Sequence, residues 1–299
     1  MSDKPIRVGK VKDVYDEGDT LLFRFSDRIS VFDKIIPNTV PHKGESLCRT
    51  SSFWFRVAKE SARVETHFIE MVSPNEMRVK KFYIPESGKG DPHEIEYVIP
   101  LEFITRYYVA GSLYDRVKEG KVRYEDLGLN HAPKYGEELD DPFFEVTTKF
   151  EKYDRPLKHG EIIEIGGMTN SELNEIKEAI LRVDRRINKS VSQRGLIHVD
   201  GKKEFAFGIG REPVLIDTFG TLDEDRWWDR KEYDEGKIVE LSKEFVRQYY
   251  RSTGYHSELY SAREKGLPEP EIPPLPPEMV KKTSDLYVTM YERITGEKW

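Results

Sequence analysis

Residues 200–226 read DGKKEFAFGIGREPVLIDTFGTLDEDR, and this stretch predicts the centre of the fold. Its apolar residues and bounding glycines are typical of a β-hairpin. A two-residue loop at Gly210-Arg211 places Ile209 opposite Glu212, because glycine supplies the positive φ that the first position of a type II′ turn requires. This loop fixes the pairing of the residues before and after it.

The predicted register gives the hairpin two different faces, because the side chains of a strand alternate with period two. One face is apolar and carries two pairs: Phe207 with Val214, and Phe205 with Ile216. The other face carries three pairs: Ala206 with Leu215, Glu204 with Asp217, and Lys202 with Phe219. We therefore expect two carboxylates directly across from each other on adjacent strands.

Glu204 and Asp217 call for a compensating cation, because opposed like charges about 5 Å apart at Cβ destabilise a sheet. Mg²⁺ is the natural candidate, since it binds through one or two carboxylates together with substrate phosphates. Lys202 lies on the same predicted face and adds a positive charge for a phosphate or a carboxylate. The alternative is a solvated polar face whose register is shifted by one residue.

Composition bounds the class of protein. A chain of 299 residues has room for two domains or one large domain. Charged residues make up 34% of the chain, against about 25% in typical globular proteins, and the mixture of both signs suggests a heat-adapted protein. The net charge of −7 argues against a nucleic-acid surface, which needs an excess of Lys and Arg.

Cellular location follows from what the sequence lacks. The single cysteine, Cys48, excludes an intramolecular disulfide and a cysteine-based metal site. No run approaches 18 apolar residues, and the opening residues 1–4 do not resemble a signal peptide. We expect a soluble, cytoplasmic protein that does not bind a membrane.

The N-terminal region predicts a second hairpin. Residues 6–15 and 20–25 have strand character and are separated by the turn at 16–19. Lys10 and Lys12 then lie on one face next to Gly9, where a ligand phosphate can approach the backbone closely. Neither a Walker loop nor a G-x-G-x-x-G motif is present, so two solvated lysines are the alternative.

A second anion site is predicted at residues 106–120. Ser112 follows Gly111 and is placed to cap a helix over 112–120, and a helix N-terminus binds anions. Arg106, at the end of the preceding strand, adds a fork of donors to the same anion. The alternative is a capped helix beside a surface arginine.

The remaining elements follow from periodicity and from capping residues. Thr169 and Glu172 form a capping box for a long helix that ends before Gly195. We expect strands over 67–72, 77–83, 94–109 and 142–154, the last presenting Lys149, and helices over 46–62, 236–251 and 278–294. Six prolines in residues 267–277 predict an extended connector.

Seven motifs in this order resemble the SAICAR synthetase family. They are GKVKDVY at 9–15, SDRISVFD at 26–33, PHKG at 41–44, R-x4-GS at 106–112, TTK at 147–149, D-x-K-x-EF at 200–205 and D-x5-D-x2-R at 217–226. The resemblance runs nearly end to end, and the closing YERITGEKW at 291–299 is similar to the longer, eukaryote-type form. It implies an α+β fold related to ATP-grasp and kinase-like architectures. A β-rich N-terminal domain at 1–110 would lie beside an α/β ATP-binding domain at 111–299.

The resemblance also implies an activity. Family enzymes are ATP-dependent ligases that join the carboxylate of CAIR, a phosphorylated imidazole ribonucleotide, to the amine of L-aspartate, giving SAICAR, ADP and phosphate. The implied cofactors are ATP and Mg²⁺, and the implied assembly is a monomer or a homodimer. Two other classes remain: a kinase or ligase of the same fold acting on another phosphorylated small molecule, and a nucleotide-binding protein without catalysis.

Site residues are carried over position by position. The resemblance assigns nucleotide binding to Lys10, Lys12, Lys149, Glu204 and Asp217, with Glu204 and Asp217 facing the metal. It assigns the ribonucleotide substrate to Arg106, Gly111, Ser112, Arg226 and Asp33. It assigns the catalytic centre to Lys202 and Asp200.

Several positions depart from the family pattern. Thr218 stands where a glutamate is usual, Leu222 replaces a proline, and Phe205-Ala206-Phe207-Gly208 replaces a shorter Phe-Gly. Tyr153-Asp154 replaces His-Asp, and Glu224-Asp225 replaces two small residues. Two acids beside Arg226 are expected to repel a phosphate or to pair with the arginine. These changes put the identity of the second substrate in question.

Overall fold

The structure is a computed structural model that describes residues 4–151 and 155–299. The chain forms two compact units. Unit 1 comprises Met1–Phe53, Phe68–Lys81 and Glu240–Trp299, and unit 2 comprises Trp54–His67 and Phe82–Val239. The boundary expected after residue 110 falls inside unit 2, and the functional division there stays a prediction. Tyr153-Asp154, and the end of the strand expected over 142–154, lie outside the described residues.

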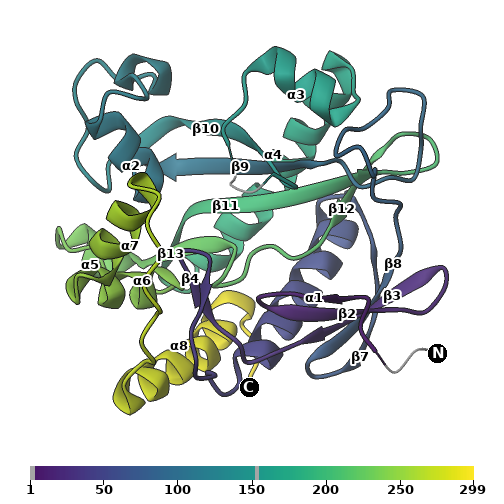
Figure 1. Cartoon of the computed structure of the whole chain (residues 1–299). Coiled ribbons are helices and arrows are strands. Elements are labelled where there is room, and N and C mark those ends of the chain that lie inside the picture. Colours follow the sequence, from purple (N-terminus) through teal and green to yellow (C-terminus); the bar gives the residue numbers. More distant parts are fainter. Residues whose placement is uncertain (1–3, 152–154) are drawn as a thin grey trace. The chain divides into compact units, whose positions relative to one another are not determined.

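Unit 1 contains a five-stranded antiparallel sheet (Figure 1). Its strands, in spatial order, are β1 (Arg7–Val8), β2 (Lys12–Asp16), β3 (Thr20–Phe25), β8 (Glu76–Lys80) and β7 (Phe68–Ser73). The predicted hairpin at 16–19 is confirmed, since β2 and β3 pair up to Asp16 and Leu21. A short two-stranded sheet, β4 (Ser30–Val31) with β5 (Lys34–Ile35), follows along the chain.

The single strand expected over residues 6–15 is wrong. The chain reverses after β1, so β1 pairs with β2 and Lys10 lies in the turn between them. Gly9 permits this reversal: its N–H donates to Lys12 O at 2.9 Å, and a Cβ at Gly9 would lie only 2.7 Å from that oxygen. Lys10 and Lys12 therefore do not share a strand face.

Helices complete unit 1. Helix α1 (Lys43–Ser61) begins in this unit, and α6 (Glu244–Ser252), α7 (Tyr255–Glu264) and α8 (Pro277–Thr295) belong to it. The helix expected over 278–294 is confirmed, and α8 is followed by Gly296 in the left-handed conformation. The helix expected over 236–251 begins only at Glu244, whose preceding residues 240–243 are irregular.

Unit 2 contains a six-stranded sheet whose centre is β11 (Leu196–Phe207) (Figure 1). Its neighbours are β9 (Leu101–Tyr108), β12 (Pro213–Ile216) and β13 (Asp225–Asp229), with β10 (Glu138–Thr148) beyond β9 and β6 (Glu65–Thr66) beyond β12. Only the β12–β6 pair is parallel among these described strands. Sheet and helices together confirm the predicted α+β class.

Helix α4 (Asn170–Ser192) packs on one face of this sheet. The predicted capping box is confirmed, because Thr169 accepts from the N–H of Glu172 and Glu172 accepts from the N–H of Thr169. The fully buried side chains of Asp184 and Lys203 form an ion pair of 2.5 Å between α4 and β11. The other helices of unit 2 are α2 (Gly111–Lys118), the 3-10 helix η1 (Tyr124–Leu127), α3 (His159–Gly166) and α5 (Arg230–Asp234).

The predicted register of the β11–β12 hairpin is wrong by one residue. Glu204 lies opposite Ile216, and Phe205 opposite Leu215. The loop has three residues instead of two: Gly208 N donates to Glu212 O at 2.9 Å, and Arg211 adopts a φ of 60°. A type I turn followed by a left-handed residue is the usual three-residue hairpin loop, and its odd length shifts the register.

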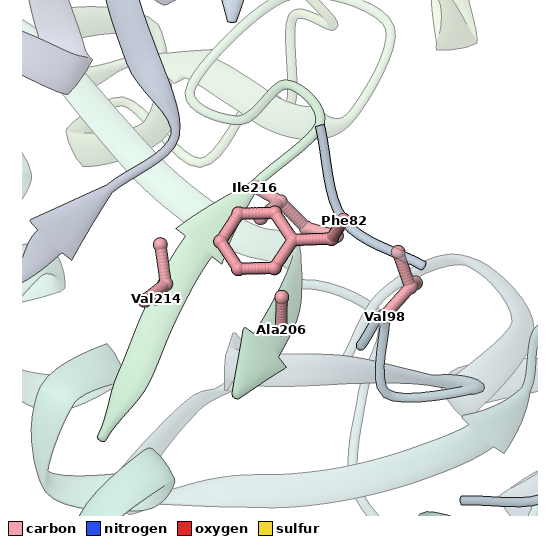
Figure 2. Close-up of a cluster of buried hydrophobic side chains, with 5 residues drawn as sticks. All are labelled: Phe82, Val98, Ala206, Val214 and Ile216. Atoms are coloured by element: carbon pink, nitrogen blue, oxygen red, sulfur yellow. The ribbon is translucent and has the colours of Figure 1, made fainter. Parts of the chain in front are cut away.

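The corrected register changes which side chains share a face. Ala206, Val214 and Ile216 lie together on one face and pack with Phe82 and Val98 in a buried apolar cluster. Figure 2 shows these five side chains gathered against the hairpin. Because Glu204 pairs with Ile216 and alternates with Ala206, its side chain lies on this same face, next to the apolar cluster.

Candidate functional site

Charged side chains line the face of the unit 2 sheet opposite α4, here called the front face. The pairing of β9 with β11 aligns Arg106 with Asp200 and Ile104 with Lys202. Since alternate residues of a strand share a face, the front face carries Glu102, Arg106, Glu145, Asp200, Lys202 and Glu204. Three neighbouring strands thus place opposite charges at close range.

One group of these side chains, the lysine cluster, is centred on Lys202. Its Nζ lies 2.8 Å from Glu102 Oε1, 2.9 Å from Glu204 Oε1 and 3.2 Å from Glu224 Oε2. Lys149, which follows β10, forms an ion pair with the other oxygen of Glu204. Glu204 is fully buried, so both of its oxygens exchange water for an ammonium group.

Asp217 also belongs to this cluster, but it does not lie on a strand opposite Glu204 as predicted. It follows the last residue of β12 and adopts a φ of 62°, so the strand ends there. Its negative charge opposes the lowering of the Glu204 pKa by Lys149 and Lys202, and it contributes to the raised pKa values of these two lysines. The two acids therefore interact electrostatically, as predicted, although they do not face each other across the ladder.

The cluster holds its lysines charged. Burial opposes ionisation of Lys202, but Glu204, Glu224 and Glu102 raise its pKa well above the ordinary value. Burial also opposes ionisation of Glu204, and Lys149 and Lys202 outweigh it and lower the pKa. Glu102 differs: burial raises its pKa to about 7, and the nearby charge of Glu204 adds to the effect. Glu102 therefore takes up a proton more readily than Glu204 does.

A second group, the arginine cluster, lies further along β11. Asp200 Oδ2 is 3.4 Å from Arg106 Nη1 and 3.2 Å from Arg226 Nη1. Glu145 joins Arg106, at 3.1 Å, to Arg116 of α2, at 2.5 Å. Burial opposes ionisation of Glu145, and these arginines outweigh it and lower its pKa.

Gly111 and Ser112 adjoin the arginine cluster. Gly111 has a φ of 52°, and a Cβ there would lie 2.5 Å from Arg226 Nη1, so glycine is required for the arginine to lie against the start of α2. The prediction that Ser112 caps this helix is wrong, because the N-cap is Ala110. Its Oγ instead accepts from Arg106 Nη2 at 3.4 Å.

The three remaining predicted residues belong to unit 1. Lys10 Nζ donates to Asp33 Oδ1 at 2.6 Å, and both side chains are exposed. Lys12 lies with its Nζ 4.8 Å from the ring centroid of Phe23. Asp33 has a φ of 65°, which places it in the tight turn between β4 and β5.

Four members of the two clusters were not predicted from the sequence: Glu102, Arg116, Glu145 and Glu224. Alternation could have found Glu102, which lies four residues before Arg106 on the same face of one strand. Glu224 and Asp225 were expected to act on Arg226, but Glu224 pairs with Lys202 and Asp225 with His198. Thr218, at the position where the family pattern has a glutamate, lies 3.5 Å from Glu224.

The described residues contain neither a metal-binding group of three or more acidic, histidine or cysteine side chains nor a membrane-spanning helix. Among them, no three or more His, Cys, Asp or Glu side chains are grouped so that they could hold a metal ion by themselves. Within residues 4–151 and 155–299, no helix is long and apolar enough to span a bilayer.

Comparisons with known proteins identify the family. Its model, described as SAICAR synthetase, matches residues 5–261. A phosphoribosylaminoimidazole-succinocarboxamide synthase of Thermoplasma acidophilum is 64% identical over 296 residues, which cover 99% of this chain and 100% of the relative. One of Nitrosopumilus maritimus is 34% identical over 291 residues, covering 97% of each.

A solved structure agrees with these relatives. The SAICAR synthase of Saccharomyces cerevisiae, complexed with SAICAR, has a TM-score of 0.74 at 25% identity and covers 99% of this chain and 95% of that one. The predicted SAICAR synthetase-like fold is thereby confirmed, and the likeness of residues 291–299 to a eukaryote-type form stays a prediction. With the family model matching most of the sequence, the chain belongs to the SAICAR synthetase family.

Proposed function

We propose that the lysine cluster binds the phosphates of ATP and that the arginine cluster binds the phosphate of CAIR. As a member of its family, the protein is a ligase of purine biosynthesis that forms SAICAR. The observation that carries the assignment is the spacing of Asp200, Lys202 and Glu204 on one face of β11. This spacing holds the two clusters side by side on a rigid strand.

The reaction needs such an arrangement. A carboxylate resists attack by an amine, so the CAIR carboxylate must first accept the γ-phosphoryl group of ATP, which turns one carboxylate oxygen into a good leaving group. Phosphoryl transfer depends on positioning and on neutralising charge, and Lys149 and Lys202 supply two fixed positive charges. The amine of L-aspartate then displaces phosphate and forms the amide bond.

Lys202 and Asp200 have different proposed roles. Lys202 bears its charge at the centre of the lysine cluster, where the transferred phosphoryl group would lie. Asp200 holds Arg106 and Arg226 together, so that the two guanidinium groups would converge on the ribonucleotide phosphate. Gly111 and Ser112 line the same position.

The donor set fits Mg²⁺. Glu204 and Asp217 would hold the ion with help from the nucleotide phosphates, because Mg²⁺ is usually bound through one or two carboxylates and substrate oxygens. Four acids of the lysine cluster, Glu102, Glu204, Asp217 and Glu224, lie near two lysines, and this excess of acidic groups supports the binding of a cation. The ion would neutralise the phosphate charges that the two lysines leave.

Residues of unit 1 complete the proposal. Lys10 and Lys12, on either side of the tight turn after Gly9, would contact nucleotide phosphates, and Asp33 would contact the ribonucleotide. The division of the chain into a phosphate-loop region at 1–110 and an ATP- and substrate-binding region at 111–299 belongs to this proposal. So do a monomeric or homodimeric assembly, a cytoplasmic location and heat adaptation, which a sedimentation measurement, localisation of the expressed protein and a melting temperature would test.

A steady-state assay tests the assignment. We expect inorganic phosphate to be released only when CAIR, ATP and L-aspartate are all present, and Lys202→Met to abolish the release. Lys189→Met, an exposed lysine of α4, is the matched control and should retain full activity. Phosphate transfer to a substrate without aspartate-dependent amide formation would instead indicate a kinase of the same fold.

A further inference from the structure

A buried histidine lies directly behind the arginine cluster. Residue pairing between β11 and β13 shifts by one between His198 and Asp200, so Val199 forms a β-bulge. Without the bulge His198 would share the front face with Asp200. With it, the His198 ring turns to the α4 side, where Nδ1 lies 2.9 Å from Asn188 Oδ1.

His198 is paired with Asp225 behind the sheet. Its Nε2 lies 2.6 Å from Asp225 Oδ2, and neither side chain is exposed to solvent. The imidazole also stacks on Trp227, with ring centroids 4.8 Å apart and planes inclined by 26°. Gly201 makes room for the pair, because a Cβ there would lie 2.9 Å from His198 Nε2 and collide with the Asp225 carboxylate.

Asp225 also fixes the loop that precedes it. Its Oδ1 accepts from the N–H of Gly220 at 2.8 Å, and its own N–H donates to Thr221 O at 2.9 Å. This loop connects Asp217 of the lysine cluster to β13. One carboxylate therefore joins the loop to β11 through His198.

Residues on either side of Asp225 point the other way. Asp225 and Arg226 are the first two residues of β13, so Arg226 lies on the front face while Asp225 lies behind it. Glu224 directly precedes the strand. Glu224 reaches Lys202, and Arg226 reaches Asp200. The contact of Asp225 behind the sheet thus fixes the start of β13, with Glu224 of the lysine cluster just before it and Arg226 of the arginine cluster just after it.

We propose that His198 and Asp225 are positioning residues for substrate binding: the buried pair holds Arg226 and Glu224 in place from behind the sheet. The inference deepens the proposed function and rests on its assignment of Arg226 to the phosphate of CAIR. Neither His198 nor Asp225 touches a substrate in this arrangement. Their effect is on the position of the side chains that do.

The experiment compares KM for CAIR across a set of variants. Arg226→Ala defines the effect of losing the phosphate contact itself. Asp225→Ala removes both the histidine contact and the Gly220 contact, and we expect KM to rise about tenfold. Asp225→Asn keeps an acceptor for the Gly220 N–H and is expected to recover most of that loss. His198→Gln should fall between the two.

A control separates positioning from general destabilisation. Ile180→Ala creates a cavity under α4, away from β13, and should lower the melting temperature without changing KM for CAIR. If Asp225→Ala and His198→Gln lower the melting temperature and leave KM unchanged as well, while Arg226→Ala raises it, the positioning inference is overturned and the proposed function stands. If Arg226→Ala leaves KM unchanged, its assigned role fails and the inference fails with it.

A second measurement tests the inference even if Asp225→Ala does not fold. In His198→Gln, the NMR cross-peak of the Arg226 side-chain Nε–H is expected to move, because Asp225 has lost the imidazole that holds it behind the sheet. An unchanged cross-peak in folded His198→Gln, together with an unchanged KM, would overturn the inference.

Discussion

Arg211 Nε donates to Glu172 Oε1 at 2.6 Å, which ties the β11–β12 turn to the first turn of α4. The same guanidinium donates to Gly167 O at 2.8 Å. These contacts hold a non-glycine residue at a φ of 60°, a conformation that costs about 1 kcal/mol for a residue with a side chain. Glu172 and Gly167, which lie 39 and 44 residues from Arg211 in sequence, thus stabilise the three-residue loop and the register of the hairpin.

Substitutions of Arg211 test this account. We expect Arg211→Ala to lower the free energy of unfolding by about 2 kcal/mol, because charge-assisted hydrogen bonds are lost while the strained φ remains. Arg211→Gly should cost about 1 kcal/mol less, since glycine adopts the left-handed conformation without strain. Urea unfolding measures both values. Equal losses for the two variants would contradict the role of φ at this position.

Glu204→Gln tests the lysine cluster. The substitution preserves shape but removes the charge that Lys149 and Lys202 share, and with it the proposed carboxylate ligand for Mg²⁺. We expect Mg²⁺-dependent phosphate release to fall about 100-fold or more, with the secondary structure unchanged by circular dichroism. Glu175→Gln, on the exposed surface of α4, should be fully active. Normal turnover in Glu204→Gln would remove this residue from the proposed site.

Glu102 predicts a pH-dependent stability. Its pKa rises from 4.5 to about 7 on folding, so the folded protein holds a proton that the unfolded chain has lost. The free energy of unfolding should therefore decrease as the pH rises between these values, by about 3 kcal/mol at most from this group. In Glu102→Gln, which mimics the protonated acid, this decrease should disappear. Denaturant titrations of both proteins at pH 5 and pH 8 measure the difference, and parallel pH profiles would contradict the prediction.

The buried pair of Lys203 and Asp184 predicts a double-mutant result. Lys203→Met alone leaves the carboxylate of Asp184 buried without its ammonium partner, beside the Tyr107 hydroxyl at 2.9 Å, and should cost about 3–5 kcal/mol of stability. Lys203→Met combined with Asp184→Leu removes both charges and should restore most of that loss. The comparison uses thermal or urea unfolding. A double variant as unstable as the single one would show that the pair contributes more than mutual neutralisation.

Elements with local determinants were predictable. The Thr169–Glu172 capping box begins α4, and Gly296 ends α8 in the left-handed conformation, because both features depend on residues within one helical turn. The helix over 236–251 was misplaced, since residues 240–243 are irregular and α6 begins only after them. Alternation along one strand also placed Lys202 and Glu204 correctly on a shared face.

The amino-acid sequence by itself determined the α+β class, the chemistry of the charged residues on β11 and the likeness to a ligase family. Tertiary structure alone decided how Asp217, Glu102 and Arg226 meet those residues. The reason is the range of the interactions involved. Hairpin register depended on a loop conformation fixed by Glu172 and Gly167, and the front face was completed by strands about 100 residues earlier, contacts that no local pattern specifies.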